Sequence, residues 1–151
     1  MPEKASRPSA RPERLAERLH SGAIHLLRRL RREDAATGLS PARLSALSVL
    51  VFGGPMRISD LARAEQVKTP TMTPIVAALE AAALIARDKD EQDARASVVR
   101  ATARGQKLME EGRARRVATL AADLRRLTAA DRAVLARAAA LMHELARARH
   151  G

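Results

Sequence analysis

The chain has 151 residues, of which 46% are apolar, and a formal net charge of +11. This length fits one domain or one protomer of a small oligomer, and the charge indicates a polyanionic partner, either nucleic acid or an anionic membrane surface. The absence of cysteine excludes disulfides, thiolate metal sites and cysteine nucleophiles. A single aromatic residue, Phe52, disfavours a β-sandwich and any module that stacks bases on aromatic rings.

The N-terminal part of the chain predicts a basic arm followed by one long helix. Residues 1–12 hold three prolines and few apolar side chains, so we expect a disordered arm. No signal peptide or membrane-spanning run of about 18 apolar residues is recognised, and a cytoplasmic protein is expected. In the segment 13–38, which ends near Gly38, apolar residues recur at helical spacing. These residues are Leu15, Leu19, Ala23, Leu26 and Leu30.

The next segment predicts three short helices. Their starts are marked by Ser or Thr, whose oxygens accept hydrogen bonds from free backbone N–H groups, and by proline, which fits a first helical turn. The predicted starts are Ser40 with Pro41, Ser59, and Thr69 with Pro70, and the predicted ends lie near Gly53, Glu65 and Ala83.

After the third short helix the pattern changes from helical to strand-like. Residues 84–87 and 96–100 are short apolar segments, and the polar residues 88–95 separate them, which predicts a hairpin with a charged tip. Residues 87–95 hold three basic and four acidic side chains. The tip is therefore not a generally basic finger.

The C-terminal part predicts two helices that cannot bury their apolar stripes in a monomer. A helix follows Thr102, and Thr128 is expected to cap the last one. Pairing with a second copy about a two-fold axis is the physical remedy for such stripes. We therefore expect residues 13–38 and 103–151 to be dimerisation helices on either side of a DNA-binding domain at 39–102.

The order of elements from residue 40 to 100 is that of a winged helix-turn-helix, in which one helix lies in the DNA major groove and a hairpin reaches the minor groove. The segments that carry a family resemblance are Leu61-Ala62, residues 67–73 (VKTPTMT), Leu79-Glu80, residues 84–87 (LIAR), Asp93-Ala94-Arg95 and residues 102–105 (TARG). In this order and spacing the chain resembles a MarR-type transcriptional regulator. The expected fold is mostly α with a small β-hairpin wing and long terminal dimerisation helices.

The resemblance implies a homodimer that binds a near-palindromic duplex operator with half-sites about 10 bp apart. It also implies repression that is relieved when a small, often aromatic or phenolic, ligand binds between the dimer helices and the winged domain. The expected ligand-binding residues are His20, His25 and Phe52. The expected DNA contacts are Lys68, Thr69, Thr71, Met72, Thr73, Lys89, Asp93 and Arg95.

Two residues depart from the family pattern. Pro74 stands where the family often has an arginine or another polar residue, and its ring and missing N–H disturb a helix unless the helix starts near Thr71. Ala83 replaces the usual glycine after the recognition helix, so it must adopt a left-handed conformation or the helix must end differently.

Other interpretations are open at this level. The threonines can be simple helix caps and Arg95 a solvated arginine. The four histidines lack metal-ligand spacing, and no phosphate-binding loop or nucleophile motif is present, so neither a metal, another cofactor nor an enzyme is expected. A non-specific architectural DNA-binding protein is the alternative function, although residues 57–107 hold nine basic and seven acidic side chains. A membrane-surface helix is disfavoured by the lack of aromatic residues.

Overall fold

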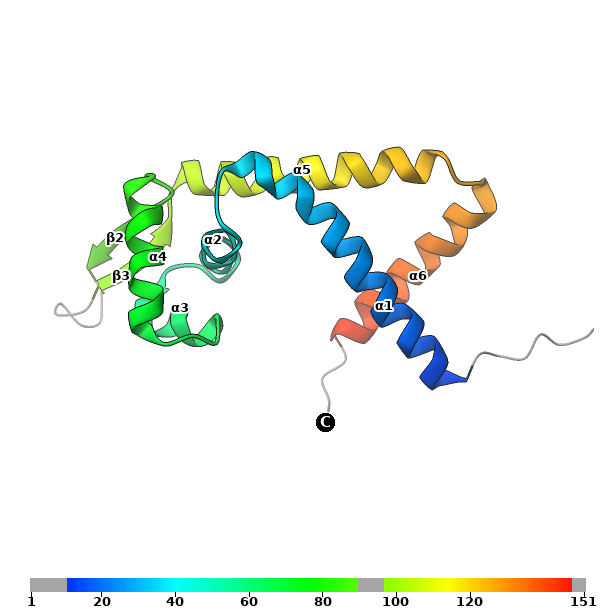
Figure 1. The fold of residues 1–151 in the computed structure, drawn as a ribbon, viewed down its shortest axis with the longest axis horizontal. Coiled ribbons are helices and arrows are strands. Elements are labelled where there is room, and N and C mark those ends of the chain that lie inside the picture. The colour runs from blue at the N-terminus through cyan, green and yellow to red at the C-terminus, as the bar shows by residue number, and fades with distance from the viewer. Residues whose placement is uncertain (1–10, 90–96, 148–151) are drawn as a thin grey trace, which may run out of the picture.

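The computed structural model describes residues 11–89 and 97–147. It is mostly helical with a small antiparallel sheet, which confirms the predicted fold class. The winged elements gather at one end of the molecule, α1 and α6 cross at the other, and α5 runs between them (Figure 1). The elements are α1 (Pro12–Leu30), the 3-10 helix η1 (Arg31–Thr37), α2 (Pro41–Gly53), β1 (Met56–Arg57), α3 (Ile58–Ala64), α4 (Thr69–Ala81), β2 (Ile85–Lys89), β3 (Ser97–Ala101), α5 (Ala103–Arg125) and α6 (Ala129–Arg147).

The predicted first helix divides into α1 and η1. The α-helix stops at Leu30, and the narrower 3-10 helix continues to a left-handed Gly38 with φ 70°. In its last turn the Thr37 hydroxyl donates to the carbonyl of Asp34 and accepts from the N–H of Leu39. Such local side-chain bonds compete with the α-helical pattern at the end of this segment, and the apolar spacing does not report them.

The starts of the short helices confirm two of three predictions. The Ser40 hydroxyl accepts from the N–H of Arg43 at the start of α2, and α4 begins at Thr69. The prediction that Ser59 caps the second short helix is wrong, because α3 begins at Ile58. Arg57, the residue before it, belongs to β1 and pairs with β3, which keeps the backbone extended up to the first helical residue.

The sheet has one strand more than predicted. β2 and β3 form the expected antiparallel hairpin, with register from Ile85 opposite Ala101 to Lys89 opposite Ser97. β1 adds to the free edge of β3, which gives the order β1-β3-β2. A strand of two residues carries no alternating pattern, so the sequence offered no signal for β1.

The buried core lies wholly in the winged end of the molecule and the adjoining part of α5. Helices α1 and α6 contain no buried residue. The buried hydrophobic residues are Ala46, Leu47, Leu50, Leu61, Ala62, Met72, Val76, Leu79, Leu84, Ile85, Val99, Ala101 and Met109.

A separate test concerns membrane-spanning helices in the described ranges. No single helix there is long and apolar enough to cross a membrane. One pair of consecutive helical segments, Pro12–Thr37 and Pro41–Gly53, passes by length and composition only when the two are joined across a 92° bend.

Candidate nucleic-acid interface

The first turn of α4 lies at the surface of the winged region. Lys68 is the N-cap residue, and the side chains of Lys68, Thr69, Thr71 and Thr73 are exposed. A helix start has backbone N–H groups without intrahelical partners and carries the positive end of the helix dipole. Together with threonine hydroxyl and methyl groups, this end is suited to contact phosphates and base edges.

Met72 does not belong to this surface, contrary to the sequence-based expectation. Its side chain is 1% exposed and packs in the core. Positions 72, 76 and 79 are four and seven residues apart and share the inner face of α4, where Val76 and Leu79 are also buried. The Met72 side chain therefore stabilises the recognition helix from within and cannot reach DNA.

Pro74 lies inside α4, because the helix begins at Thr69 and not near Thr71. Without an N–H it cannot donate to the carbonyl four residues earlier, and one hydrogen bond of the helix is lost there. The carbonyl that loses this donor is that of Pro70. The carbonyl of the preceding residue, Thr69, accepts a hydrogen bond from the Thr73 hydroxyl at 3.0 Å. This hydroxyl keeps its acceptor capacity, so a base or water donor can still reach it.

The C-terminal end of α4 is tied to the wing. Glu80 forms an ion pair with Arg87 of β2, with an N–O distance of 2.9 Å. Ala83 adopts a left-handed conformation with φ 57°, which was one of the two alternatives predicted for this position. The Thr102 hydroxyl donates to the carbonyl of Ala83 at 2.8 Å. The left-handed conformation costs roughly 1–2 kcal/mol for a residue with a Cβ. These contacts hold recognition helix and wing in one unit.

The described part of the wing presents few free cations. Arg87 pairs with Glu80, and Arg100 pairs with Asp88 on the neighbouring strand. Lys89 is exposed at the end of β2. The remaining predicted wing contacts, Asp93 and Arg95, lie outside the described residues.

Gly105 sets the junction between the winged region and α5. A Cβ at this position would lie 2.2 Å from the Leu84 carbonyl oxygen, closer than any side chain tolerates. Thr102 caps α5 by accepting from the Gly105 N–H at 3.1 Å, and its own N–H donates to the Leu84 carbonyl. The close approach of two backbones here positions the wing on the long helix.

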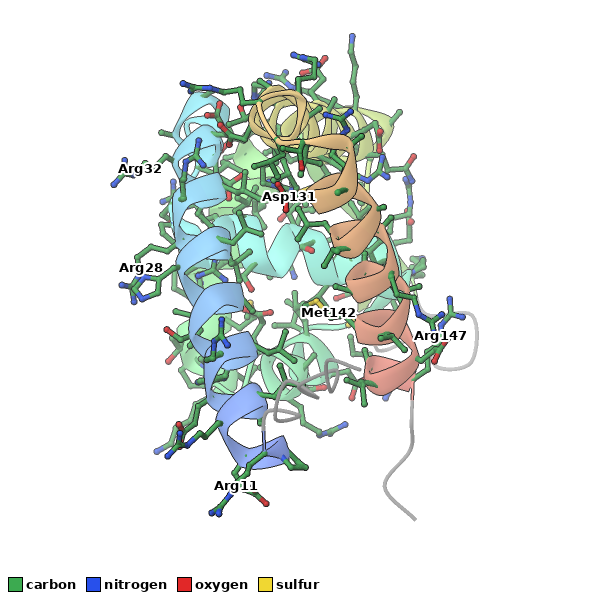
Figure 2. The ribbon with its side chains drawn as sticks, turned by 90° about the vertical axis from the view of Figure 1, so that its right-hand side faces the viewer. Arg11, Arg28, Arg32, Asp131, Met142 and Arg147 are labelled. Carbon is green, nitrogen blue, oxygen red and sulfur yellow. The ribbon has the colours of Figure 1, made fainter. Side chains whose placement is uncertain are left out.

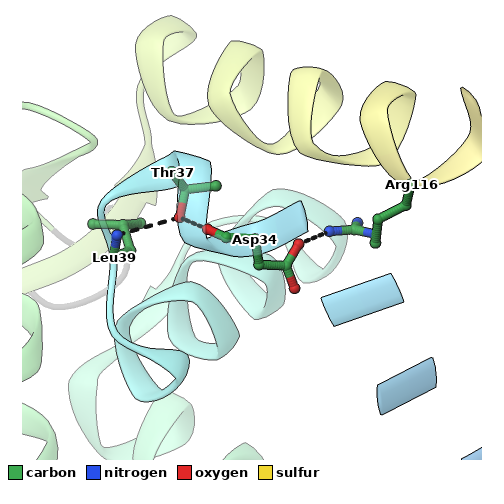
Figure 3. Close-up of polar contacts among 4 residues, drawn as sticks. All are labelled: Asp34, Thr37, Leu39 and Arg116. Atoms are coloured by element: carbon green, nitrogen blue, oxygen red, sulfur yellow. Dashed lines mark hydrogen bonds and ion pairs between the residues drawn. The ribbon is translucent and has the colours of Figure 1, made fainter. Parts of the chain in front are cut away.

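A cavity of about 800 Å³ lies between α1, η1, α2 and α5. Arg116 of α5 forms an ion pair with Asp34 of η1 at its edge (Figure 3). Most of the other lining groups are apolar, with two serine hydroxyls from α2. The lining residues are Leu27, Arg31, Asp34, Ala35, Leu39, Pro41, Leu44, Ser45, Ser48, Met109 and Arg116.

The three residues predicted to bind a ligand do not meet at this cavity. His20 lines a smaller apolar hollow of about 240 Å³ between α1 and α6, while His25 lines neither of the two. Phe52 is 77% exposed at the end of α2. The sequence-based prediction chose polar and aromatic residues that are rare in this chain. The polar residues that line this cavity include arginines and serines, which come from separate elements and do not stand out in the sequence.

The helical end of the molecule exposes large apolar side chains. They lie on α1 and α6, whose ribbons cross in one view and stand side by side in the other, with Met142 labelled on α6 (Figure 2). Such a concentration is uncommon on a monomer surface and marks an interaction site. The exposed large hydrophobics of these two helices are Leu15, Leu19, Ile24, Leu26, Leu27, Val134, Leu135, Leu141, Met142 and Leu145.

In the described parts of the chain no group of three or more His, Cys, Asp or Glu side chains is placed to hold a metal ion. His143 has its ring Nδ1 2.8 Å from the carbonyl of Ala139 on its own helix.

Comparison with known proteins identifies the arrangement. The model of the MarR family matches residues 39–97. An HTH-type transcriptional regulator of Mycobacterium bovis is 33% identical over 129 residues, which cover 85% of this chain and 90% of the relative. A solved structure from Pseudomonas aeruginosa has a TM-score of 0.76 and 29% identity and covers 94% of this chain and 100% of that one.

Two further solved structures share the fold and hold a ligand. NadR in complex with 4-hydroxyphenylacetate has a TM-score of 0.58 and 24% identity, covering 99% of this chain and 100% of that chain. A Staphylococcus aureus MepR variant bound to an oligodeoxyribonucleotide has a TM-score of 0.68 and 18% identity, with coverage of 87% and 95%.

Proposed function

The chain belongs to the MarR family of transcriptional regulators, which are not enzymes, and we propose that it acts as a dimeric repressor of a near-palindromic operator. The observation that carries this proposal is the first turn of α4. There Lys68, Thr69 and Thr71 are exposed at a helix start that is fixed by a buried inner face. The MepR structure supports it, because a protein of the same fold binds an oligodeoxyribonucleotide. A regulator of this kind works in the cytoplasm.

The dimer part of the proposal is supported by the two terminal helices. Helices α1 and α6 have no buried residue, yet they carry a row of large apolar side chains. Burying that row against a second copy removes apolar surface from water at roughly 25 cal/mol per Å². A two-fold dimer would then present two α4 helices about one DNA turn apart, which accounts for a near-palindromic site.

The ligand part of the proposal is supported by the cavity beside α5. It lies between the helices assigned to the dimer and the winged region, so a bound molecule would contact both. Arg31, Arg116 and Ser48 place donors beside mostly apolar side chains, which suits a small aromatic molecule with an acidic or phenolic group. Arg116 also pairs with Asp34, the one carboxylate of the lining, and the Ser45 hydroxyl donates to Glu65. NadR, which shares the fold, binds 4-hydroxyphenylacetate, and this supports the proposal.

A gel-shift titration with unrelated competitor DNA over a salt series tests the proposal. We expect an operator fragment to remain bound at competitor concentrations that remove a shuffled fragment. A specific complex keeps an affinity advantage of 10³-fold or more as salt rises, whereas purely electrostatic binding does not. Equal loss of both fragments would favour the alternative, a non-specific architectural protein.

A thermal-shift screen with aromatic acids, with Arg116→Gln as the insensitive control, tests the ligand part.

A further inference from the structure

The outer face of α1 carries a row of cations that the DNA-binding surface does not use. Consecutive residues of this row are four, seven, three and four positions apart, which places them on one side of the helix. We call this row the outer α1 stripe. It consists of Arg14, Arg18, His25 and Arg28 of α1 and of Arg32 at the start of η1, and all five side chains are exposed.

Two arginines at the contacts between α1, η1 and α5 are paired with carboxylates, in contrast to the stripe. Arg29, the residue beside Arg28, forms an ion pair with Asp123 of α5 at 2.7 Å, and Arg116 pairs with Asp34. Within residues 11–89 and 97–147 no carboxylate lies within 4 Å of a stripe cation. Ion pairs with α5 or η1 therefore neutralise Arg29 and Arg116, whereas the stripe keeps its positive charge.

The stripe points away from the rest of the protomer. Figure 2 shows Arg28 and Arg32 on the side of α1 that is opposite to α6. The apolar residues Leu19 and Ala23 lie on the other face of α1, where they line the hollow shared with α6. The winged elements are at the far end of the molecule (Figure 1). A straight duplex held by α4 is thus not the natural partner of this face.

We propose that the outer α1 stripe binds the phosphate backbone of a second DNA duplex, so that the operator-bound protein can hold two DNA segments. This inference rests on the proposed function in one respect, which is that the winged region binds the first duplex. All permanent cations of the stripe are arginines, whose planar guanidinium groups bind phosphate through two parallel hydrogen bonds. From Arg14 to Arg28 they extend over about 21 Å along α1 at 1.5 Å per residue, a length that meets several phosphates in a row.

Two other occupants fit the stripe less well. A second copy of the chain would set equal rows of positive charge against each other, which is unfavourable. A membrane surface would require the apolar face of α1 to enter the lipid, but that face is turned towards α5 and α6, and α1 contains no aromatic anchor. The duplex needs no apolar contact and no sequence-specific side chain.

The test uses the full-length protein saturating an immobilised operator duplex, followed by capture of a labelled random-sequence duplex. In the double variant Arg18→Gln/Arg28→Gln we expect capture of the second duplex to fall at least ten-fold. Two lost phosphate contacts should also lower the salt slope of capture by about two. Operator binding should stay within two-fold, and circular dichroism should be unchanged, because both residues are exposed on a helix.

The matched control is Lys107→Gln/Arg113→Gln, which removes the same charge from exposed positions of α5 that are paired with Glu111 and Glu110. It should capture the second duplex like the unmutated protein. Equal capture by the stripe variant and the unmutated protein would overturn the proposal. So would stripe-dependent flotation with vesicles of anionic lipid in the absence of duplex capture. Failure to bind the operator in the first step would refute the proposed function but not the proposal for the stripe. In that case the protein itself is tethered, and its binding of the random-sequence duplex tests the stripe.

Discussion

The winged region and the helical region solve the problem of burial in opposite ways. From α2 to the start of α5 the chain encloses its own core, with Leu47, Leu61 and Val99 fully buried. Helices α1 and α6 carry large apolar side chains but contain no buried residue within the protomer. The first region therefore buries its apolar side chains by itself, whereas for the second we propose burial against another copy of the chain. Substitutions should separate the two, because they act on different equilibria.

The largest effect is expected for Leu141→Asp in α6. Leu141 is 40% exposed in the protomer and lies in the apolar row that we assign to the dimer contact. A buried, unpaired carboxylate costs roughly 3–5 kcal/mol, and the two-fold axis places one in each copy. Sedimentation at micromolar concentration should show a dimer for the unmutated protein and for Leu141→Met, and a monomer or unfolded chain for Leu141→Asp. A monomeric mass for the unmutated protein would contradict the assignment of the apolar row on α1 and α6 to a dimer contact.

Leu47→Ala should destabilise the winged region without dissociating the dimer. The residue is fully buried, and truncation of a buried leucine costs about 2–5 kcal/mol through lost transfer energy and the remaining cavity. Urea unfolding should report this loss, while sedimentation still shows a dimer below the transition. Phe52→Ala is the control, since a side chain that is 77% exposed should contribute less than about 0.5 kcal/mol. A similar loss for both variants would mean that the core is misplaced.

Gly105→Ala tests the junction between the two regions. The new Cβ would press on the Leu84 carbonyl, a backbone atom that cannot move aside, and overpacking of this kind costs about 1–3 kcal/mol. The melting temperature should fall. Gly22→Ala on α1 meets no atom within 4 Å and should raise stability by roughly 0.5–1 kcal/mol, because alanine favours the helix. An unchanged melting temperature for Gly105→Ala would show that the two backbones are not in close contact.

Arg95→Ala tests an arginine that the sequence predicts at the tip of the wing and that lies outside the described residues. We expect weaker binding to every duplex by about 1–3 kcal/mol and a salt slope lower by about one, because an arginine in a narrow minor groove reads shape and charge. Binding isotherms at several salt concentrations measure both quantities. The same affinity and the same slope as the unmutated protein would show that this arginine does not touch DNA.

The smallest effect is expected for Thr73→Ala. Its hydroxyl donates to the Thr69 carbonyl, a bond that contributes little to a helix, so stability should change by less than about 0.5 kcal/mol. Discrimination at one symmetric pair of operator positions should nevertheless relax, whereas Thr73→Ser should retain the part that depends on the hydroxyl. Isotherms with singly substituted operators measure this. Unaltered discrimination at every position would remove Thr73 from the base contacts.

Local chemistry made much of the fold predictable from the sequence. Ser40 and Thr128 are caps whose side chains act on the next turn, and both were recognised as such. Met72 was misplaced because the residue pattern from 67 to 73 marks a recognition helix without saying which of its faces is buried. The family resemblance placed a ligand site between the terminal helices and the winged region, but the lining of this cavity could not be predicted, since Asp34 and Arg116 are 82 positions apart and meet only through the packing of α5 on η1.

Selection of bound duplexes from a random pool tests the central claim most directly, namely that a two-fold helical region presents two recognition helices to DNA. The unmutated protein should enrich a near-palindrome whose half-sites lie about 10 bp apart, because that distance is one turn of B-DNA. Leu141→Asp should enrich at most a single half-site. Recovery of a non-palindromic sequence, or of no common sequence, by the unmutated protein would contradict the account.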